Sequence, residues 1–348
     1  MNNVFIIAEA GVNHNGNPDI AKRLIDVAVD AGANAVKFQT FQADKLVIPN
    51  ADKANYQLDN TNKNETQYDM LKKLELAEDA YSKLFKYSSK KNIIFISTPF
   101  DEESLDIICD IGVPIIKVPS GEITNQPFLY RIAQKQKPII ISTGMSGLGE
   151  IENAIHWINW NQNSLNFDSF PLENHINLLH CVSNYPAAFQ DINLNAIQTM
   201  KRAFGVPVGF SDHSLGIEVS IAAVAIGASI IEKHFTLDKT LEGPDHRASL
   251  EPHELKHMIS GIRHIEVAMG DGIKKPVQSE NNTRQVARKS LVAAKDISKG
   301  RILTSDDLIA KRPGTGLSPE FKDIIIGLQA KNHITKNTLL KWEDFKGA

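Results

Sequence analysis

The chain has 348 residues, a formal net charge of −3 (Lys+Arg 38, Asp+Glu 41) and two cysteines. This balance gives no electrostatic reason to expect nucleic acid or an anionic membrane as a partner, so a small-molecule substrate is favoured. Cys109 and Cys181 are too few for a disulfide framework and fit a reducing cytoplasm. No apolar stretch reaches the roughly 20 residues that cross a bilayer, and the run 4–8 is too short for a secretory signal. We therefore expect a soluble, cytoplasmic protein.

Eight short apolar runs, rich in β-branched residues, recur along the chain with helix-like stretches between them. They span 4–8, 35–38, 93–96, 115–116, 139–141, 176–179, 206–208 and 229–231. Continuous apolar runs of this length are typical of parallel strands buried on both faces, and the stretches between them suit helical crossover connections. Eight such units predict an α/β fold, a (β/α)8 TIM barrel, over residues 1–270.

The segments between the runs carry recognisable helix and loop signals. Residues 18–31 place apolar side chains on one helical face, with Pro18 in the first turn and Gly32 after the last. Residues 43–65 are rich in Asn, Asp and Lys, and we expect them to form a long loop over the barrel mouth, a candidate substrate lid. The Asn-rich residues 159–174 predict another surface excursion. Further helices are expected over 66–90 and 252–269.

The composition changes after the last predicted barrel helix. Residues 271–285 are rich in Gly, Lys, Ser, Asn and Pro, as expected of a linker. Residues 286–348 contain short β-branched runs broken by Gly and Pro, with a helix start at Thr304. This second module is too small to hold much core alone, so we expect it to pack on another surface.

Each predicted strand ends at a polar residue. In chain order these residues are Glu9, Gln39 with Lys37 just before it, Thr98, Lys117 and Ser120, Ser142 and Thr143, His180, Ser211 and His213, and Glu232 and His234. The active sites of TIM barrels lie at the carboxyl ends of the strands. We therefore expect these side chains to meet in one mouth.

Two histidines stand about one βα unit apart. His213 and His234 would follow neighbouring strands, beside the carboxylates of Glu9 and Glu232. Neutral imidazoles next to carboxylates are typical of a divalent metal site, and only two nitrogen ligands would leave room for water and substrate, as in a catalytic site. The alternatives are ordinary histidines and a salt-bridged structural Glu9. If Glu9 is functional, it could be a general base, a general acid or an outer-shell ligand.

A second cluster is cationic and hydroxylic. It comprises Lys37, Thr98, Lys117, Ser120, Ser142 and Ser211. Ammonium and hydroxyl donors together suit a phosphate dianion, which presents only acceptor oxygens, so a phosphorylated substrate is indicated. One alternative is that the hydroxyls cap helices and the lysines are surface charges. Another is that Lys37 or Lys117 forms a Schiff base, as in barrel aldolases, which would make the enzyme insensitive to chelators.

Ten motifs, in order, resemble those of the sialic acid synthases. They are IAEAGVNHNG at 7–16, VKFQTF at 36–41, STPFDEES at 97–104, KVPSGE at 117–122, ISTGM at 141–145, HCVSNYP at 180–186, GFSDHS at 209–214, EKHFTLDK at 232–239, GPDH at 243–246 and KRPG at 311–314. The resemblance covers essentially the whole chain. Its tail looks like the small antifreeze-like (SAF, β-clip) domain of that family.

The resemblance implies a condensation of phosphoenolpyruvate with the open-chain aldehyde of an N-acetylated hexosamine, releasing phosphate and using Mn2+ or Mg2+. His213 and His234 would be the metal ligands, and Glu9 would deprotonate the attacking water. Lys37, Thr98, Lys117, Ser120, Ser142 and Ser211 would hold phosphoenolpyruvate, with Ser183 nearby. Gln39, Glu122, Tyr185 and Asp245 would face the sugar. Arg312 would reach the sugar's acetamido group in the barrel of the other subunit of a domain-swapped homodimer.

Two departures and several alternatives bear on the substrate. Some relatives have asparagine at the position of Ser183, and some have aromatic residues near Val286 and Arg288. Our first prediction is N-acetylneuraminate synthase acting on N-acetylmannosamine. The second is legionaminic acid synthase acting on 2,4-diacetamido-2,4,6-trideoxymannose, because pocket shape alone separates the two. A pseudaminic acid synthase and a catalytically silent carrier of the SAF domain are further alternatives.

Overall fold

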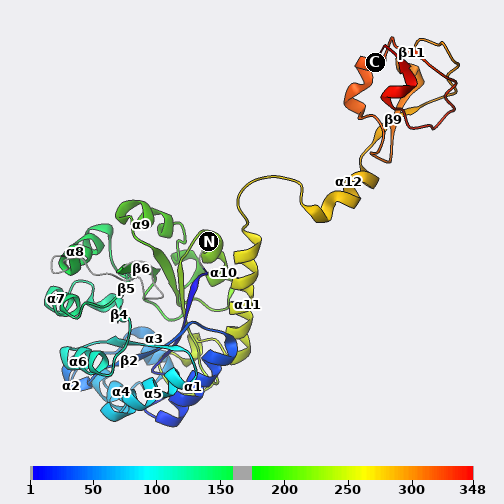
Figure 1. Ribbon diagram of the computed structural model, residues 1–348. Coiled ribbons are helices and arrows are strands. Elements are labelled where there is room, and N and C mark those ends of the chain that lie inside the picture. The colour runs from blue at the N-terminus through cyan, green and yellow to red at the C-terminus, as the bar shows by residue number, and fades with distance from the viewer. Residues whose placement is uncertain (1–2, 160–174, 348) are drawn as a thin grey trace. The chain divides into compact units, whose positions relative to one another are not determined.

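The computed structural model describes residues 3–159 and 175–347 of the chain (Figure 1). The chain divides into two compact units, Met1–Gly270 and Asp271–Ala348. The Asn-rich excursion expected at 159–174 lies, apart from Asn159, outside the described residues. No helix in the described parts of the chain is long and apolar enough to cross a membrane.

The first unit is a closed barrel of eight parallel strands in sequential order, surrounded by helices (Figure 1). The strands are β1 (Phe5–Gly11), β2 (Ala35–Thr40), β3 (Ile94–Pro99), β4 (Ile116–Val118), β5 (Ile139–Ser142), β6 (Ile176–Cys181), β7 (Val208–Asp212) and β8 (Ile230–His234). The predicted TIM barrel is confirmed. The strands run past the ends of the predicted apolar runs, so that Glu9 and Ser211 lie within strands instead of following them.

Helices connect the strands and cover the barrel. They are α1 (Pro18–Ala31), α2 (Ala43–Leu46), α3 (Asn55–Asn60), α4 (Gln67–Leu74), α5 (Glu78–Lys90), α6 (Glu102–Asp110), α7 (Gln126–Gln134), α8 (Leu148–Asn159), α9 (Ala196–Phe204), α10 (Glu218–Ala225) and α11 (Pro252–Ala268). Helix α1 has the bounds that the sequence predicts. The side chain of Asn17 caps its first turn, and Gly32 ends it at a φ of 84°, a conformation that glycine adopts without strain.

The barrel interior explains how the strands position the polar residues. An apolar cluster fills the barrel interior on the amino-terminal side of the polar residues. On several strands, the residue two positions after a member of this cluster is polar. The pairs are Ile7 and Glu9, Ala35 and Lys37, Ile96 and Thr98, Ile115 and Lys117, Ile140 and Ser142, and Ile230 and Glu232. Side chains two apart on a strand point the same way, so the polar residues stand inside the barrel above an apolar plug.

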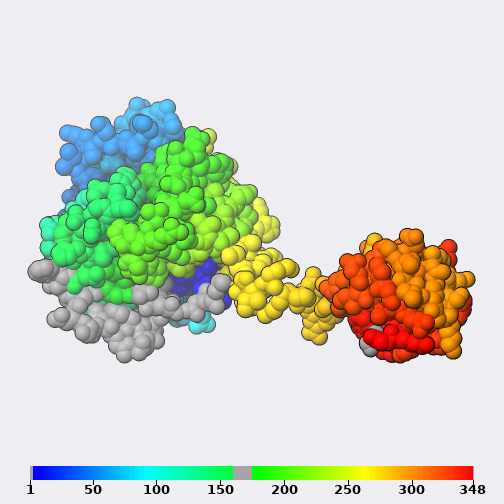
Figure 2. Space-filling model, turned by 90° about the horizontal axis from the view of Figure 1, so that it is seen from above, coloured from blue at the N-terminus to red at the C-terminus, as the bar shows by residue number. Residues whose placement is uncertain are grey.

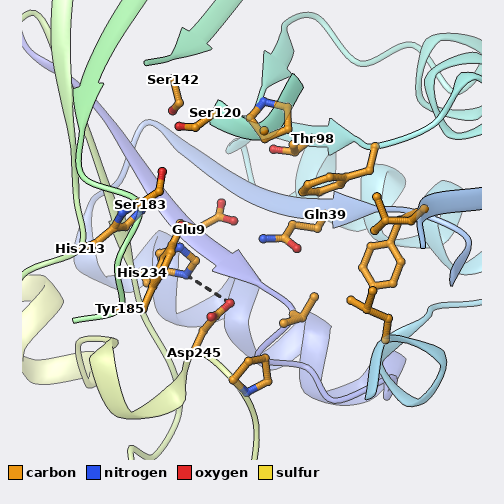
Figure 3. Close-up of a pocket in the computed structure, with 18 of the residues that line it drawn as sticks. Glu9, Gln39, Thr98, Ser120, Ser142, Ser183, Tyr185, His213, His234 and Asp245 are labelled. Atoms are coloured by element: carbon orange, nitrogen blue, oxygen red, sulfur yellow. Dashed lines mark ion pairs between the residues drawn. The ribbon is translucent and has the colours of Figure 1, made fainter. Parts of the chain in front are cut away.

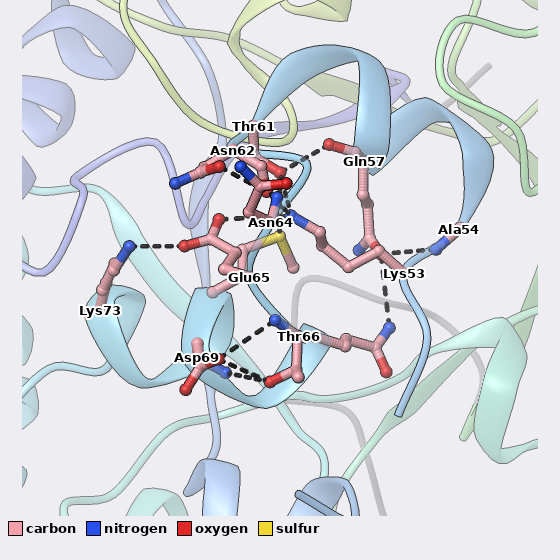
Figure 4. Close-up of polar contacts among 12 residues, drawn as sticks. Lys53, Ala54, Gln57, Thr61, Asn62, Asn64, Glu65, Thr66, Asp69 and Lys73 are labelled. Carbon is pink, nitrogen blue, oxygen red and sulfur yellow. Dashed lines mark hydrogen bonds and ion pairs between the residues drawn. The ribbon is translucent and has the colours of Figure 1, made fainter. Parts of the chain in front are cut away.

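The segment after β2 is more ordered than the sequence predicts. Residues 43–65, predicted as a long loop over the barrel mouth, contain two short helices, α2 and α3, and several of these residues line the cavity there. The ammonium group of Lys53 is buried and donates to Thr61 Oγ1 at 2.9 Å and to the carbonyl oxygen of Asn62 at 2.5 Å (Figure 4). In the space-filling view, blue atoms that include the segment after β2 gather at one edge of the barrel unit (Figure 2).

The second unit has its own small core. Strands β9 (Ser290–Ala293) and β10 (Leu308–Lys311) pair antiparallel, as do β11 (Gln329–Ala330) and β12 (Phe345–Lys346). Leu291, Leu303, Leu340 and Phe345 belong to one buried apolar cluster, so this module holds more core than its size led us to expect. Helix α12 (Asn281–Ala287) begins inside the predicted linker, and a 3-10 turn (Ser305–Asp307) follows Thr304, at the predicted helix start.

Candidate functional site

A cavity of about 430 Å³ opens at the carboxyl ends of the barrel strands (Figure 3). Its lining includes every candidate site residue that the sequence places in the barrel: Glu9, Lys37, Gln39, Thr98, Lys117, Ser120, Glu122, Ser142, Ser183, Tyr185, Ser211, His213, His234 and Asp245. The register between neighbouring strands determines the position of each residue along the barrel axis. Glu9 is the register partner of Lys37 on β2 and of His234 on β8. The structure therefore brings these residues together as the strand pattern predicts. Thr143 and His180, which the same pattern placed in the mouth, do not line this cavity, because Thr143 Oγ1 donates to the carbonyl oxygen of Leu179 at 2.9 Å and His180 Nε2 lies 2.6 Å from that of Ile192.

Two lysines and two carboxylates form a buried ionic cluster at the floor of the cavity. Lys37 Nζ lies 2.7 Å from Glu9 Oε2 and 3.7 Å from Glu232 Oε1, and Lys117 Nζ lies 3.5 Å from Glu232 Oε1. Burial raises the pKa of Glu9 to about 7, against the opposing effect of Lys37. Burial also disfavours charge on Glu232, but Lys117 and Lys37 hold its pKa below the usual range. Glu9 can therefore exchange a proton near neutral pH, whereas Glu232 remains a carboxylate.

Hydroxyl and amide donors lie beside Lys117. Its Nζ donates to Ser142 Oγ at 2.6 Å, and Ser120 Oγ accepts from the backbone N–H of Gly144 at 3.0 Å. A Cβ at Gly144 would lie 2.2 Å from Ser183 Oγ and 2.8 Å from Ser120 Oγ, so only glycine lets these two hydroxyls approach the turn. One cation and several converging hydroxyls make a site suited to a phosphate or carboxylate group.

The two histidines face each other across the cavity, with ring centroids 5.6 Å apart. His213 Nδ1 lies 2.7 Å from the carbonyl oxygen of Val182, so Nδ1 carries the proton and Nε2, 3.4 Å from Ser211 Oγ, carries the lone pair. Burial lowers the pKa of His213 to about 4 and that of His234 well below its usual value. Both rings are therefore neutral at pH 7, which is the form that binds metals.

The donor set fits a divalent ion with an incomplete protein shell. His234 Nδ1 is buried without a hydrogen-bond partner and faces Asp245 Oδ2 at 4.0 Å, and Glu232 Oε2 is likewise buried without a partner. No group of three or more His, Cys, Asp or Glu in the described residues has the geometry of a metal site. Two imidazoles with unpartnered polar atoms around them match an ion that takes its remaining ligands from water and substrate.

Tyr185 forms one wall of the cavity. Its ring centroid is 4.1 Å from that of His213 and 4.9 Å from that of Tyr56 on α3 (Figure 3). Asp245 is buried beside it, and burial raises the pKa of this carboxyl to about 6. Glu122 stands at the edge, where its carboxylate accepts a hydrogen bond from Asn125. These groups surround the space that an acceptor would fill next to the histidines.

The opposite end of the cavity is apolar, and sequence reasoning missed it. Seven side chains form a separate hydrophobic cluster here, and all of them line the cavity. We call this set the mouth cluster: Val12, Phe41, Leu46, Met70, Leu71, Leu74 and Phe100. In Figure 3 the unlabelled side chains drawn to the right of Gln39 contain only carbon atoms. The helical period of 66–90 was visible in the sequence, but nothing in the spacing directs α4 to the barrel mouth.

A buried ion pair behind the histidines was also missed. Lys233 has no exposed surface, and its Nζ lies 3.0 Å from Asp212 Oδ2. Asp212 also accepts hydrogen bonds from the hydroxyls of Ser214 and Ser220 at 2.6 Å. Because side chains alternate along a strand, Asp212 and Lys233 point away from the cavity next to residues that point into it. This pair ties together the strand ends that carry His213 and His234.

Arg312 lies in the second unit. Its Nε donates to the carbonyl oxygen of Ala287 at 3.0 Å, and its side chain is exposed. An exposed guanidinium is free to meet an anion or an amide carbonyl. The predicted approach of Arg312 to the barrel of another subunit stays a prediction.

Comparison with known proteins agrees with this arrangement. Residues 24–274 match the NeuB family and residues 288–346 match the SAF domain. The chain belongs to the NeuB family. It is thus a nonulosonic acid synthase, an enzyme of the phosphoenolpyruvate-dependent, carbon–carbon bond-forming class that the sequence predicts, with the predicted SAF domain at its C-terminal end.

Individual members of the NeuB family are similar over almost the whole chain. N,N'-diacetyllegionaminic acid synthase of Campylobacter jejuni is 50% identical over 98% of this chain and 100% of its own. The Legionella pneumophila protein of the same name is 47% identical over 97% of this chain and 94% of its own. The crystal structure of the N-acetylneuraminic acid synthetase of Leptospira borgpetersenii, 39% identical, covers 81% of this chain and 90% of its own with a TM-score of 0.68.

Proposed function

We propose that this NeuB-family enzyme is an N,N'-diacetyllegionaminic acid synthase, which condenses phosphoenolpyruvate with 2,4-diacetamido-2,4,6-trideoxymannose and water, releasing phosphate. The observation that carries the proposal is the full-length similarity, at 50% and 47% identity, to two synthases of that name. The sialic acid synthetase is less similar, at 39%. The order of our two sequence-based predictions is therefore reversed, and N-acetylneuraminate synthase becomes the second candidate.

The polar end of the cavity suits phosphoenolpyruvate. Lys117, Ser142 and Ser120 supply the donors for its phosphate, and Lys37 with Thr98, 3.0 Å apart, adds a second cationic group. The two lysines neutralise charge that builds on the phosphate as its bond to C2 breaks. Because both ammonium groups are buried, their field acts on the leaving group with little screening by water.

The histidine side of the cavity suits the aldehyde end of the sugar. His213 and His234 would hold Mn2+ or Mg2+, whose chemistry when bound is to polarise a carbonyl oxygen as a Lewis acid. Tyr185, Gln39 and Asp245 line the space next to them and orient the acceptor so that C3 of phosphoenolpyruvate reaches the aldehyde carbon. Glu9, with a pKa near neutrality, takes a proton from the water that adds to C2.

Arg312 completes the proposed site only in a homodimer. The SAF domain of one subunit would bring this guanidinium to the sugar's acetamido group in the barrel of its partner. Its exposed side chain is compatible with that role. A barrel that lacked the partner's arginine would still bind phosphoenolpyruvate, because the groups for that substrate lie within the first unit.

Phosphate release from phosphoenolpyruvate tests the proposal. The enzyme is assayed with manganese against the diacetamido sugar, N-acetylmannosamine and the pseudaminic acid precursor, each with and without EDTA. We expect chelator-sensitive release with the diacetamido sugar at a kcat/KM at least tenfold above the others. A preference for N-acetylmannosamine would assign N-acetylneuraminate synthesis instead. No phosphate release with any sugar, together with trapping of pyruvate on the enzyme by borohydride, would indicate a Schiff-base aldolase. No release and no trapping would indicate a silent SAF-domain carrier.

A further inference from the structure

We infer that the mouth cluster is a specificity subsite that receives the C6 methyl group of the acceptor and so selects 6-deoxy sugars over their 6-hydroxy counterparts. The inference rests on the proposed function, because it assigns the far end of that same acceptor. It adds residues of α2 and α4, and the residues that directly follow β1, β2 and β3, to the substrate site.

The polar end of the cavity is assigned to phosphoenolpyruvate and the sugar's aldehyde, so the apolar end is left for the carbons of the sugar farthest from the aldehyde. In Figure 3 the two histidines, Glu9, Ser120 and Ser142 all lie to the left of Gln39. The apolar part of the remaining lining is the mouth cluster, in which Met70 and Leu74 are 3% and 6% exposed, and Tyr56, Gln57 and Gln67 line the cavity as well. An open-chain hexose held by its aldehyde at the histidines must extend away from them, so its last carbons reach the apolar wall.

The chemistry of this wall discriminates at C6. Burial of a methyl group against aliphatic and aromatic side chains is favourable because it removes the methyl group from water. A hydroxymethyl group in the same place leaves its hydroxyl without a hydrogen-bond partner among the side chains of the cluster. Val47 extends the wall next to Leu46 and also lines the cavity. The preference therefore has an attractive and a repulsive component.

The subsite is held in shape before any ligand arrives. The Nζ of buried Lys53 donates to Thr61 and lies 3.3 Å from Glu65 Oε1, and Glu65 also pairs with Lys73 at 2.5 Å (Figure 4). These contacts tie the loop between α3 and α4 to α4 itself, which carries Met70, Leu71 and Leu74. A preformed apolar recess loses little conformational entropy on binding, so it can discriminate between acceptors that differ by one oxygen.

Two acceptors that differ only at C6 test the subsite in the wild-type enzyme. They are 2-acetamido-2,6-dideoxymannose and N-acetylmannosamine, compared by kcat/KM with phosphoenolpyruvate and manganese present, or by inhibition constants against the diacetamido sugar where an analogue is not turned over. We expect the 6-deoxy sugar to be favoured about tenfold or more. A ratio near one, with the diacetamido sugar turned over normally, would overturn the inference and leave the proposed function standing.

Substitutions in the wall give the second test. Val47→Thr, which keeps the shape and adds a hydroxyl, and Leu71→Asn should each bring the preference for the 6-deoxy sugar down to about threefold or less. Ile48→Thr is the matched control, because Ile48 is 72% exposed and does not line the cavity, and it should leave the ratio unchanged. If neither Val47→Thr nor Leu71→Asn altered the ratio of kcat/KM between the two sugars, the mouth cluster would not discriminate between acceptors at C6. Were no acceptor turned over, the proposed function would fail, and equilibrium binding of the two analogues would still report the ratio.

Discussion

Glu9 and Lys37 are register partners on neighbouring strands, and their side chains meet with Oε2 and Nζ 2.7 Å apart inside the barrel. Neither side chain is more than 4% exposed. A buried pair of this kind adds little net stability, but each partner holds the other in place and controls its charge. The pairing places a proton acceptor with a pKa near 7 directly beside a cation suited to the substrate's phosphate.

Glu9→Gln should lower kcat by about 10²- to 10⁴-fold, the range typical of a lost general base. Phosphoenolpyruvate should still bind, because the residues beside Lys117 are unchanged. Phosphate release in a steady-state assay gives kcat, and equilibrium binding of phosphoenolpyruvate gives its Kd. A variant that keeps more than a tenth of wild-type kcat would remove Glu9 from the role of base.

The pH dependence of the wild-type rate provides a second check on Glu9. Its pKa is raised to about 7 by burial, so the carboxyl is protonated and inactive as a base below that pH. We expect kcat to rise with pH through the neutral range and then level off. The residual activity of Glu9→Gln should lack this rise, since glutamine does not titrate. A rise of equal size in both proteins would assign the ionisation to another group.

Lys117→Met should weaken phosphoenolpyruvate binding more than it alters sugar binding. Lys117 contacts Ser142 at 2.6 Å and Glu232 at 3.5 Å, so the substitution removes the cation beside the hydroxyl cluster and leaves Glu232 with Lys37 and the hydroxyl of Ser211 as partners. We expect the KM for phosphoenolpyruvate to rise at least tenfold. The KM for the sugar in the same assay is the internal control, and an equal rise in both constants would contradict the assignment.

The strand pattern predicts the barrel and its polar ring because both depend on local periodicity. Ile7 and Glu9, or Ile230 and Glu232, are two residues apart on one strand, so the sequence itself says that they share a face. Eight repeats of that pattern leave little freedom in the topology. The positions of the two proposed metal ligands follow from the same logic, as His234 is the last residue of β8 and His213 comes just after β7.

The remainder of the site depends on contacts that the spacing does not encode. Met70 and Leu71 reach the cavity because the segment after β2 folds around Lys53, a charged residue whose burial no hydropathy pattern indicates. The outward-facing pair of Asp212 and Lys233 looks, in the sequence, like two surface charges. The role of Arg312 is predicted from the family resemblance alone, because its predicted position depends on another subunit.

Lys233→Met should destabilise the barrel by about 3–5 kcal/mol, the cost of leaving the buried carboxylate of Asp212 without its cation. The double variant Asp212→Asn with Lys233→Met should lose less than the sum of the two single variants, because no uncompensated charge remains. Urea denaturation monitored by tryptophan fluorescence measures these differences. Manganese titration is the second readout. The Kd for manganese should rise in Lys233→Met, since the Asp212–Lys233 pair holds the strand ends that carry His213 and His234. Strictly additive effects would show that the two residues act independently.

Asp307 should control the acid stability of the second unit. Its carboxylate accepts from Thr304 N at 2.8 Å and pairs with Lys295 at 3.1 Å and Arg301 at 3.0 Å. Although burial opposes the charge, these donors hold the pKa of Asp307 well below its usual value. A carboxyl whose pKa is depressed by folding contributes stability that is present above its unfolded pKa, about 3.9, and is lost as the pH falls towards the folded value.

The substitution Asp307→Asn tests this contribution. At pH 7 the variant should lose about 2–3 kcal/mol of stability in the second unit, because amide replaces a carboxylate that serves several charged and polar donors. Hydrogen exchange of the amides of β9 and β10 in the full chain measures that loss without interference from the barrel. The difference between wild type and variant should shrink as the pH is lowered from about 4 to 2, since the carboxyl of Asp307 is then protonated in the unfolded chain while it stays charged in the folded one, which favours unfolding. A difference that is the same at pH 2 and pH 7 would show that the charge of Asp307 does not stabilise this unit.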